Sequence, residues 1–387
     1  MTKKKSRQRT ETKQKTTTSQ SGKKPELSTT KRYAFTGLTV LVPFVLLAMF
    51  ELGLRIAGYG NDLRLAYRVE ENGKAWWEIN QNVGRRYFGL RPDFARQTEE
   101  ARIAAPKPTN GYRVICLGES SMAGFPYNKN ATMPGILRTY LQMLFPDREI
   151  EVVNLGIAAV NSFAVRDLMS AVIALDPDLV LIYTGHNEFY GALGVGSAFS
   201  FGNNRNLINL YLRLLHYLLQ QTIRKVTELM KGATAIEATL DTPVMQLMAR
   251  EQTIAYGSEL FVKAARSFEE NLSEALEMAK TSGVHVAVGT LVSNLKDHPP
   301  FISAPTTTLS RDEKKNWQEA FSAGIGLMKA GEYQTALEKF ALASRIDSTD
   351  AELAYYRAKC FFANGDTIAA ARLFSRARDL DLLRFRA

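Results

Sequence analysis

The sequence predicts an α/β protein with a parallel, three-layer sheet domain, preceded by one transmembrane helix and followed by paired helices in repeats. Three observations support this prediction. Between residues 110 and 300, short apolar runs that end in small polar residues alternate with amphipathic stretches. An uncharged run of 18 residues precedes this region, and a 34-residue period follows it. The 387-residue length also exceeds that of one ordinary domain of roughly 150 residues.

The composition is close to that of a soluble globular protein, with 45% hydrophobic and 23% charged residues. It excludes a protein made mainly of membrane spans or of disordered sequence. Cys116 and Cys360 lie far apart, without the spacing of a zinc finger or of a disulfide-rich domain. The sequence has no Walker loop, dinucleotide-binding motif or metal-ligand spacing, so we expect no cofactor and no metal.

The first 32 residues supply nine of the ten net positive charges. They hold 11 of the 49 basic residues and 2 of the 39 acidic ones, which leaves 38 and 37 for the rest of the chain. Lys, Thr, Ser and Gln dominate residues 1–32 and cannot bury enough apolar surface to fold, so the sequence predicts a disordered, cytoplasmic tail. A nucleic-acid-binding arm is the alternative, but we expect no nucleic-acid partner.

Residues 33–55 are predicted to form a transmembrane anchor. The uncharged run Tyr33–Phe50 is long enough to cross a bilayer, and Pro43 is tolerated in such a helix. A cleaved secretory signal is the alternative, but the basic lead is unusually long and no clear small-x-small cleavage site follows. The basic tail should hold the N-terminus in the cytoplasm and place the remaining chain on the periplasmic side of a bacterial inner membrane.

Residues 61–109 are predicted to be a stalk and lead-in with little regular structure. Trp76 and Trp77 are candidates for stacking on a sugar or for the membrane interface, but packing beneath a loop is the expected role.

Four apolar runs predict the strands of the domain at residues 110–300. The strands are expected at residues 112–117, 150–155, 179–184 and 284–291, with helices near 135–144, 162–175 and 259–280. Continuous apolar strands separated by helices indicate a parallel sheet covered on both faces. Ligands of such sheets bind beyond the carboxyl ends of the strands, so the residues at these ends are the candidates for a site.

Small polar residues lie at the ends of the first three strands: Gly118-Glu119-Ser120, Asn154-Leu155-Gly156 and Gly185-His186-Asn187-Glu188. This set resembles the SGNH, or GDSL-like, hydrolase family, whose four markers are Ser, Gly, Asn and His. The family's Gly-Asp-Ser and Gly-x-Asn-Asp blocks are matched with Glu in place of Asp, and its second-block glycine is matched by Gly156. The resemblance covers roughly residues 110–300 and implies a flavodoxin-like fold and hydrolysis of an ester.

The resemblance implies that Ser120 is the nucleophile and that Gly156 and Asn187 belong to the oxyanion hole. A serine attacks an ester when a base removes its proton and donors stabilise the oxyanion. The N–H groups of Ser120 and Gly156 and the Asn187 amide are three candidate donors, and a glycine at 156 would let the substrate approach closely. The structural alternative is that Ser120 caps a helix and Asn187 caps a turn.

The family's base is a histidine that follows an aspartate by three residues. The chain has four histidines, His186, His216, His285 and His298, and none has this spacing. His298 follows the fourth strand beside Asp297 and is the best candidate, although two prolines stiffen the segment after it. We expect the family's histidine block to lie beyond Ala387.

A 34-residue period marks the C-terminal region. Six pairs of positions repeat: Ala320 and Ala354, Gly331 and Gly365, Ala336 and Ala370, Phe340 and Phe374, Ala343 and Ala377, Asp347 and Asp381. This is the period of tetratricopeptide (TPR) repeats, and it predicts two units over residues 314–381. A plain pair of helical hairpins is the alternative. Because two units leave an open apolar end, we expect them to recruit a protein partner.

Residues 203–230 are apolar at helical spacing. A helix packed on the sheet domain is the expected structure, with a lid, a membrane-facing helix or a partner surface as alternatives.

These expectations describe a membrane-anchored, extracytoplasmic esterase or acyl hydrolase that acts on an envelope ester, such as a lipid or glycan acyl group. The alternative is an inactive binding or scaffold protein that keeps the sheet and recruits a partner through its repeats.

Overall fold

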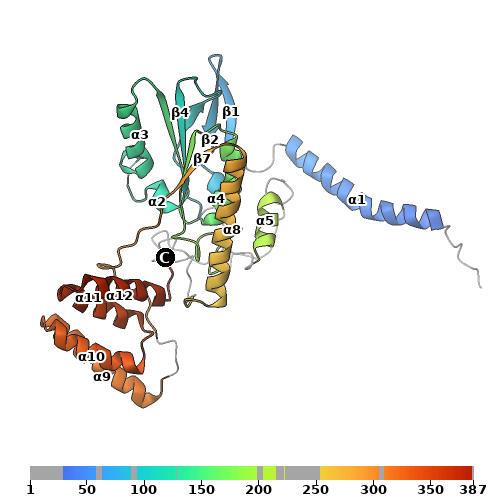
Figure 1. Cartoon of the computed structure of the whole chain (residues 1–387). Coiled ribbons are helices and arrows are strands. Elements are labelled where there is room, and N and C mark those ends of the chain that lie inside the picture. Colours follow the sequence, from blue (N-terminus) through green and yellow to red (C-terminus); the bar gives the residue numbers. More distant parts are fainter. Residues whose placement is uncertain are drawn as a thin grey trace, which may run out of the picture.

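The computed structural model describes residues 29–57, 63–88, 94–127, 129–197, 204–214, 222, 253–304 and 309–385. Most of the predicted basic tail and most of the apolar stretch at 203–230 lie outside these residues. Figure 1 shows a long N-terminal helix, an α/β domain and a group of C-terminal helices. The predicted α/β class with a parallel sheet is confirmed.

The N-terminal helix α1 spans Thr29–Ile56 and contains Pro43. Its segment Phe35–Ile56 is long and apolar enough to cross a membrane, and none of it is buried in the rest of the protein. Near the end of the helix, Arg55 pairs with Glu51 at 2.8 Å one turn earlier, so the two charges offset each other.

Residues 66–104 form an antiparallel sheet, which corrects the expectation of little regular structure at 61–109. Its strands are β1 (Ala66–Glu71), β2 (Lys74–Ile79) and β3 (Arg102–Ala104), in that order. Asn72 and Gly73 join β1 to β2 with φ of 52° and 73°, the two positive values that a tight hairpin turn requires. Between β2 and β3, the short 3₁₀ helix Val83–Tyr87 contributes buried side chains to the main core.

Buried Arg113 joins this small sheet to the parallel sheet. Its Nη2 donates to the Ala104 carbonyl at 2.7 Å, and its Nε pairs with Glu151 at 2.6 Å. Glu151 also accepts from the Ala104 N–H at 2.9 Å. The segment predicted as a stalk is therefore part of the folded domain.

The parallel sheet has the strand order β5-β4-β6-β7 within the described residues. The strands are β4 (Gly111–Gly118), β5 (Glu149–Gly156), β6 (Leu179–Tyr183) and β7 (His285–Val288), so the last is shorter than predicted. Gly118 at the end of β4 is paired with Gly156 of β5 and with Tyr183 of β6. The register therefore brings the ends of three strands together, which places the three sequence blocks at one edge.

Helices cover both faces of this sheet (Figure 1). Helix α3 (Met133–Leu144) packs against the face of β4 that carries Val114 and Cys116. Helices α4 (Ser162–Ile173), α5 (Arg205–Leu214) and α8 (Glu259–Thr281) cover the face with Ile115 and Leu117. Alternate residues of β4 thus enter opposite cores, as a doubly covered strand requires.

The C-terminal part that the structure describes forms two helical hairpins. The helices are α9 (Arg311–Lys329), α10 (Tyr333–Ile346), α11 (Ala351–Ala363) and α12 (Thr367–Leu380). Gly331 and Gly365 make the two turns with φ of 83° and 86°, and the repeated alanines and phenylalanines other than Ala320 are buried between the helices. Helical repeats are therefore a sound description of the 34-residue period.

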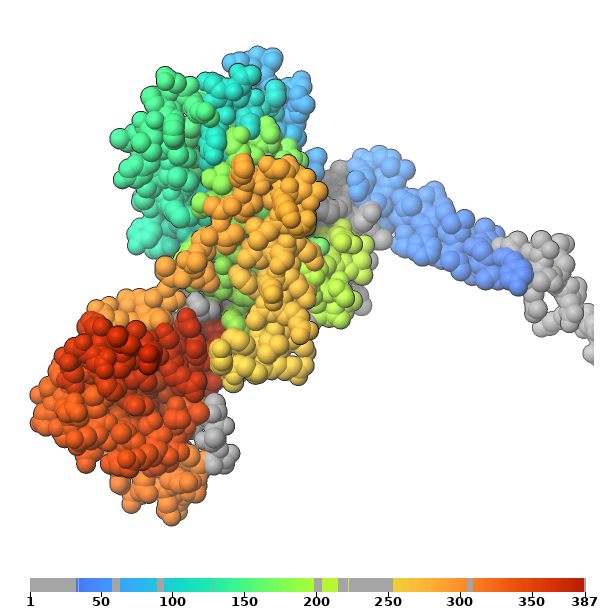
Figure 2. All heavy atoms as spheres, in the orientation of Figure 1, coloured from blue at the N-terminus to red at the C-terminus, as the bar shows by residue number. Residues whose placement is uncertain are grey.

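The second hairpin is docked on the α/β domain through the segment Asp381–Phe385 (Figures 1 and 2). Asp381 accepts hydrogen bonds from the N–H groups of Phe301 and Ile302 at 2.9 and 3.1 Å. The Phe385 ring lies 4.9 Å from the ring of Tyr190, in the loop that follows β6. We call Asp381–Phe385 the C-terminal strap, and it brings the repeats against the loop that carries Asn187.

Candidate active site

Ser120 lies at the carboxyl end of the central strand, where β4 turns into the short helix α2 (Ser120–Ala123). It is the first residue of that helix and is partly exposed. Gly124 ends the helix with φ of 85°, and a Cβ at this position would lie 2.1 Å from the Thr132 side chain. No residue in the described part of the chain makes a hydrogen bond to Ser120 Oγ. The hydroxyl therefore lies where a strand-end nucleophile would lie, and no base among the described residues is bonded to it.

Glu119 fastens the loop after β6 to the turn that carries Ser120. Its side chain is buried, and Oε1 accepts from Thr184 Oγ1 and from the Gly185 N–H, both at 2.7 Å. Its Oε2 accepts from the Asn187 N–H at 2.9 Å. Burial raises the pKa of Glu119, and the three hydrogen bonds oppose that rise by favouring the carboxylate. The clamp fixes Asn187 relative to the residue next to Ser120.

Asn187 carries a buried amide group without a partner. The residue is 3% exposed, and its Nδ2 has no hydrogen-bond partner in the described part of the chain. Its backbone is held at both ends, because its N–H binds Glu119 and its carbonyl accepts from the Gly191 N–H at 2.6 Å. An unpaired buried donor costs about 1–3 kcal/mol, so the position demands an explanation beyond packing.

Gly156 is held differently from what the sequence suggested. Its N–H donates to Asn154 Oδ1 at 3.0 Å, and Asn154 Nδ2 reaches the Ala123 carbonyl at 3.3 Å. A Cβ on Gly156 would lie 2.1 Å from the Ala123 nitrogen. The glycine is needed here because α2 packs directly on the end of β5, and its close approach to a substrate stays a prediction.

Glu188 follows Asn187 in the loop after β6, and its buried side chain contacts Ser162, the first residue of α4. Its Oε1 accepts from Ser162 Oγ at 2.9 Å and its Oε2 from the Ser162 N–H at 3.1 Å. Asn271 of α8 donates to the same Ser162 hydroxyl at 2.9 Å. Burial raises the pKa of Glu188 to about 8, since these hydrogen bonds only partly compensate the desolvated charge. Hydrogen bonds to two buried carboxyl groups, those of Glu119 and Glu188, thus hold the third sequence block around Asn187.

The described histidines have other contacts. His186 Nε2 lies 3.2 Å from the Val292 carbonyl, and His285 begins β7 with its side chain exposed. His298 is exposed, with its Nδ1 3.4 Å from the Pro299 carbonyl and its ring 5.1 Å from that of Phe301. His216 lies outside the described residues. Among the described histidines, none is hydrogen-bonded to Ser120 or to a carboxylate.

The segment that carries His298 binds the repeats. The Lys296 carbonyl accepts from the Tyr355 hydroxyl of α11 at 2.8 Å, and Ser303 Oγ accepts from the Glu352 N–H at 3.0 Å. Asp297, the neighbour of His298, lies 3.6 Å from Lys296. The candidate base is therefore part of the junction with the repeats.

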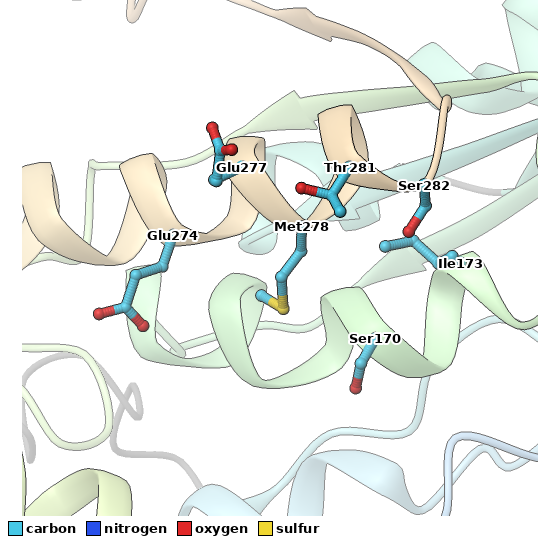
Figure 3. A pocket seen from close by; sticks show the side chains of 7 residues that line it. All are labelled: Ser170, Ile173, Glu274, Glu277, Met278, Thr281 and Ser282. Atoms are coloured by element: carbon cyan, nitrogen blue, oxygen red, sulfur yellow. The ribbon is translucent and has the colours of Figure 1, made fainter.

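A cavity of about 570 Å³ opens between α4 and α8, away from the carboxyl ends of the strands (Figure 3). Ser170, Ile173, Glu274 and Met278 are among its lining residues, and none of the predicted site residues lines it. In the described part of the chain, no three His, Cys, Asp or Glu side chains gather in a way that could hold a metal ion.

Sequence reasoning identified Ser120, Gly156 and Asn187, and the structure places all three at one edge of the sheet. It did not identify the structural roles of Glu119, Asn154 and Glu188. A carboxylate directly before the serine was visible in the sequence, but its partners lie 65 to 68 positions away. Such a clamp becomes evident only when the strands are paired.

No family model matches the chain, and no curated protein does. Among solved structures, it is similar to AlinE4, an SGNH-hydrolase family esterase, with 15% identity, a TM-score of 0.24 and coverage of 56% of this chain and 95% of that one. It is also similar to a variant of Axe2, an acetyl xylan esterase from Geobacillus stearothermophilus, with 14% identity, a TM-score of 0.21 and coverage of 45% and 75%. A third is BT4096, a gut microbial diltiazem-metabolizing enzyme, with 17% identity, a TM-score of 0.22 and coverage of 47% and 38%. Likenesses at this level assign no role to a residue, so the site stands on its own geometry.

Proposed function

We propose that this chain is a membrane-anchored serine esterase or acyl hydrolase of the SGNH type. The observation that carries the proposal is the buried Asn187 Nδ2, which has no partner among the described residues. A donor held rigidly beside a strand-end serine is what an oxyanion hole requires, because it costs no reorganisation when charge develops.

Hydroxide from the solvent would remove the Ser120 proton as Oγ attacks the carbonyl carbon of the ester, and the carbonyl oxygen would take the electron pair and accept a hydrogen bond from Asn187 Nδ2–H. Collapse of this tetrahedral intermediate breaks the bond to the alkoxy group, which takes a proton from water and leaves as the alcohol, with the acyl group on Ser120. Water then releases the acid and restores the serine. The Ser120 N–H at the start of α2 is a further proposed donor for the same oxygen.

Gly156 remains a proposed member of the oxyanion hole, with one added condition. Its N–H donates to Asn154 Oδ1 in this structure, so a substrate oxygen would have to share or replace that acceptor. Asn187 is therefore the stronger candidate of the two donors.

The location belongs to the same proposal. With α1 in the bacterial inner membrane and the basic tail in the cytoplasm, the site would face the periplasm and an ester of the cell envelope. The described domain begins at residue 63, six peptide links after Ala57, which keeps the start of the domain close to the end of α1.

One observation favours a second candidate function, a non-catalytic envelope binding or scaffold protein. No described histidine is bonded to Ser120, and the segment carrying His298 is engaged by the second hairpin. In that case the same pocket would bind an ester or acyl group without cleaving it, and the repeats, as TPR units, would hold a protein partner.

Labelling with a fluorophosphonate, read by intact mass and peptide mapping, tests the proposal. We expect a slow, single modification on Ser120 that Ser120→Ala removes and that Ser121→Ala leaves unchanged, since Ser121 is an exposed neighbour in the same turn. Modification at several exposed serines, or equal labelling of Ser120→Ala, would refute the nucleophile. Labelling of Ser120 without turnover of any ester would favour the binding protein.

A further inference from the structure

A row of leucines on α5 is exposed, although the opposite face of the helix is buried in the domain. Leu207, Leu210 and Leu214 are 56%, 51% and 39% exposed, and their spacing places them on one side of the helix. Ile208 and Leu212 on the other side belong to the main core. We call the three exposed residues the leucine stripe.

The leucine stripe lies beside the place where the chain enters the domain from α1. The Leu63 carbonyl accepts from Arg86 Nη1 at 3.3 Å, and Arg86 Nη2 pairs with Asp167 of α4 at 3.0 Å. The preceding residue of α4, Arg166, donates to Asn209 of α5 at 3.2 Å. The start of the domain and α5 are therefore attached to adjacent residues of one helix.

The membrane-crossing candidate ends only a short stretch of chain before this place. Its 22 residues, Phe35–Ile56, make a helix of about 33 Å, close to the thickness of a bilayer core. Six peptide links join Ala57 to Leu63, and a chain of that length reaches about 20 Å at most. A bilayer crossed by α1 would thus lie within about 20 Å of Leu63.

Helix α3 lies on the other side of the sheet (Figure 1) and carries a second exposed apolar face. Its large exposed residues are Met133, Ile136, Tyr140, Met143 and Leu144. The sheet lies roughly 10 Å from the α4 layer, and α3 lies roughly 10 Å beyond the sheet. With about 5 Å for the radius of α3, its outer surface is about 25 Å from the α4 layer. A bilayer against α3 would be farther from Leu63 than the link can reach, so the tether length favours α5.

We infer that the leucine stripe of α5 rests in the interface of the bilayer that α1 crosses. This inference rests on the proposed membrane anchor but not on the proposed chemistry. The three leucines would enter the boundary between headgroups and acyl chains, and exposed Arg213 on the same helix would lie at the level of the lipid phosphates. The sheet domain would then have one defined side toward the membrane, with α3 directed away from it.

The test uses the full chain in vesicles of phosphatidylcholine and phosphatidylglycerol that contain a nitroxide-labelled quencher lipid. An environment-sensitive fluorophore is placed by Leu46→Cys in α1, by Leu210→Cys in the stripe and by Met143→Cys on α3. Leu210 and Met143 are matched positions, since both are exposed apolar residues of a helix. The chain without an added cysteine serves as the blank, because Cys116 and Cys360 are buried.

We expect the probes at positions 46 and 210 to lose about half of their emission to the quencher lipid, and the probe at 143 to lose less than about a tenth. Quenching at 46 with none at 210 would overturn the inference and leave the anchor standing. Stronger quenching at 143 than at 210 would also overturn it. No quenching at 46 would refute the anchor and the inference together, whatever the outcome of the labelling at Ser120.

Discussion

Two of the segments that leave the carboxyl edge of the sheet, those after β6 and β7, are held by different hydrogen-bond partners. The loop after β6 is tied inward, because Glu119 holds three groups of residues 184–187 and Glu188 is bound to Ser162. The segment after β7, residues 289–304, starts beside β6, where Val292 is bonded to Tyr183 and His186, but from Lys296 onward it is bonded to α11 and the C-terminal strap. The comparison teaches that the sheet fixes the proposed oxyanion donor, whereas the segment with the candidate base serves to hold the repeats.

This difference also changes the expected role of the repeats. Repeats that only recruit a protein partner, as the sequence predicts, could be deleted without loss of the sheet. The C-terminal strap packs Phe385 against Tyr190 and bonds the Leu382 carbonyl to the Ile254 N–H at 2.9 Å, so deletion would uncover part of the α/β domain. We now expect such a deletion to destabilise the loop that carries Asn187.

The largest effect should come from removing the proposed oxyanion donor. Asn187→Ala is expected to lower the rate of Ser120 acylation by an activated ester by about 10²–10³, equivalent to about 2.7–4 kcal/mol of transition-state stabilisation. Stopped-flow measurement of product release gives the rate, and thermal unfolding checks that the fold is kept. Asn187→Asp should lose as much, because it replaces a donor by an acceptor. A wild-type rate in both variants would leave Asn187 with only a structural role.

The C-terminal strap should show the next effect. Asp381→Ala leaves the N–H groups of Phe301, Ile302 and Leu383 without their shared acceptor, at a cost on the order of 3 kcal/mol in free energy of unfolding. Urea titration measures it. Asp379→Ala is the matched control on the same turn: its carboxylate pairs with half-exposed Arg378, and it should cost less than about 1 kcal/mol. Equal losses in the two variants would mean that the strap does not hold the repeats.

The buried carboxyl of Glu188 should make stability depend on pH. Because its folded pKa of about 8 lies above the ordinary value of 4.5, the stability it contributes is present below pH 4.5 and is lost as the pH rises through about 8. The unfolding midpoint of the wild type should therefore be lower at pH 8.5 than at pH 5, and this difference should be smaller in Glu188→Gln. Parallel changes in the two proteins would show that Glu188 ionises as it does in the unfolded chain.

The smallest effect should come from the candidate base. His298→Asn should change the rate of Ser120 acylation by less than about twofold, since His298 is exposed and contacts Pro299 and Phe301. A loss of tenfold or more would show that this segment moves to the serine when substrate binds.

Local patterns predicted the elements of the sheet domain. The apolar runs of β4, β5 and β6 ended at the residues where the structure ends the strands, to within one position, because burial on both faces leaves a continuous signal. The hairpin of β1 and β2 is also a local feature of the sequence, and the pair Asn72-Gly73 is the signal that would have predicted it. Trp76 and Trp77 were interpreted as candidates for stacking or for packing beneath a loop, whereas they belong to strand β2.

Contacts between distant segments could not be predicted in the same way. The residue types at the site were visible, but the Glu119 clamp joins positions 119 and 187, and the C-terminal strap joins 254 with 382. The role of Gly156 depended on where α2 packs. These features follow from the pairing of strands and the docking of helices, which no short window of sequence contains.

The central claim is that the described chain builds the acylation site without a histidine paired to Ser120. The most direct test is the rate of Ser120 acylation by an activated ester from pH 5.5 to 7.5. Without a histidine base, the rate should rise tenfold per pH unit, in proportion to hydroxide, and show no inflection. A plateau with a midpoint near pH 6.5 that disappears when His186, His285 or His298 is replaced would contradict the claim and identify the base.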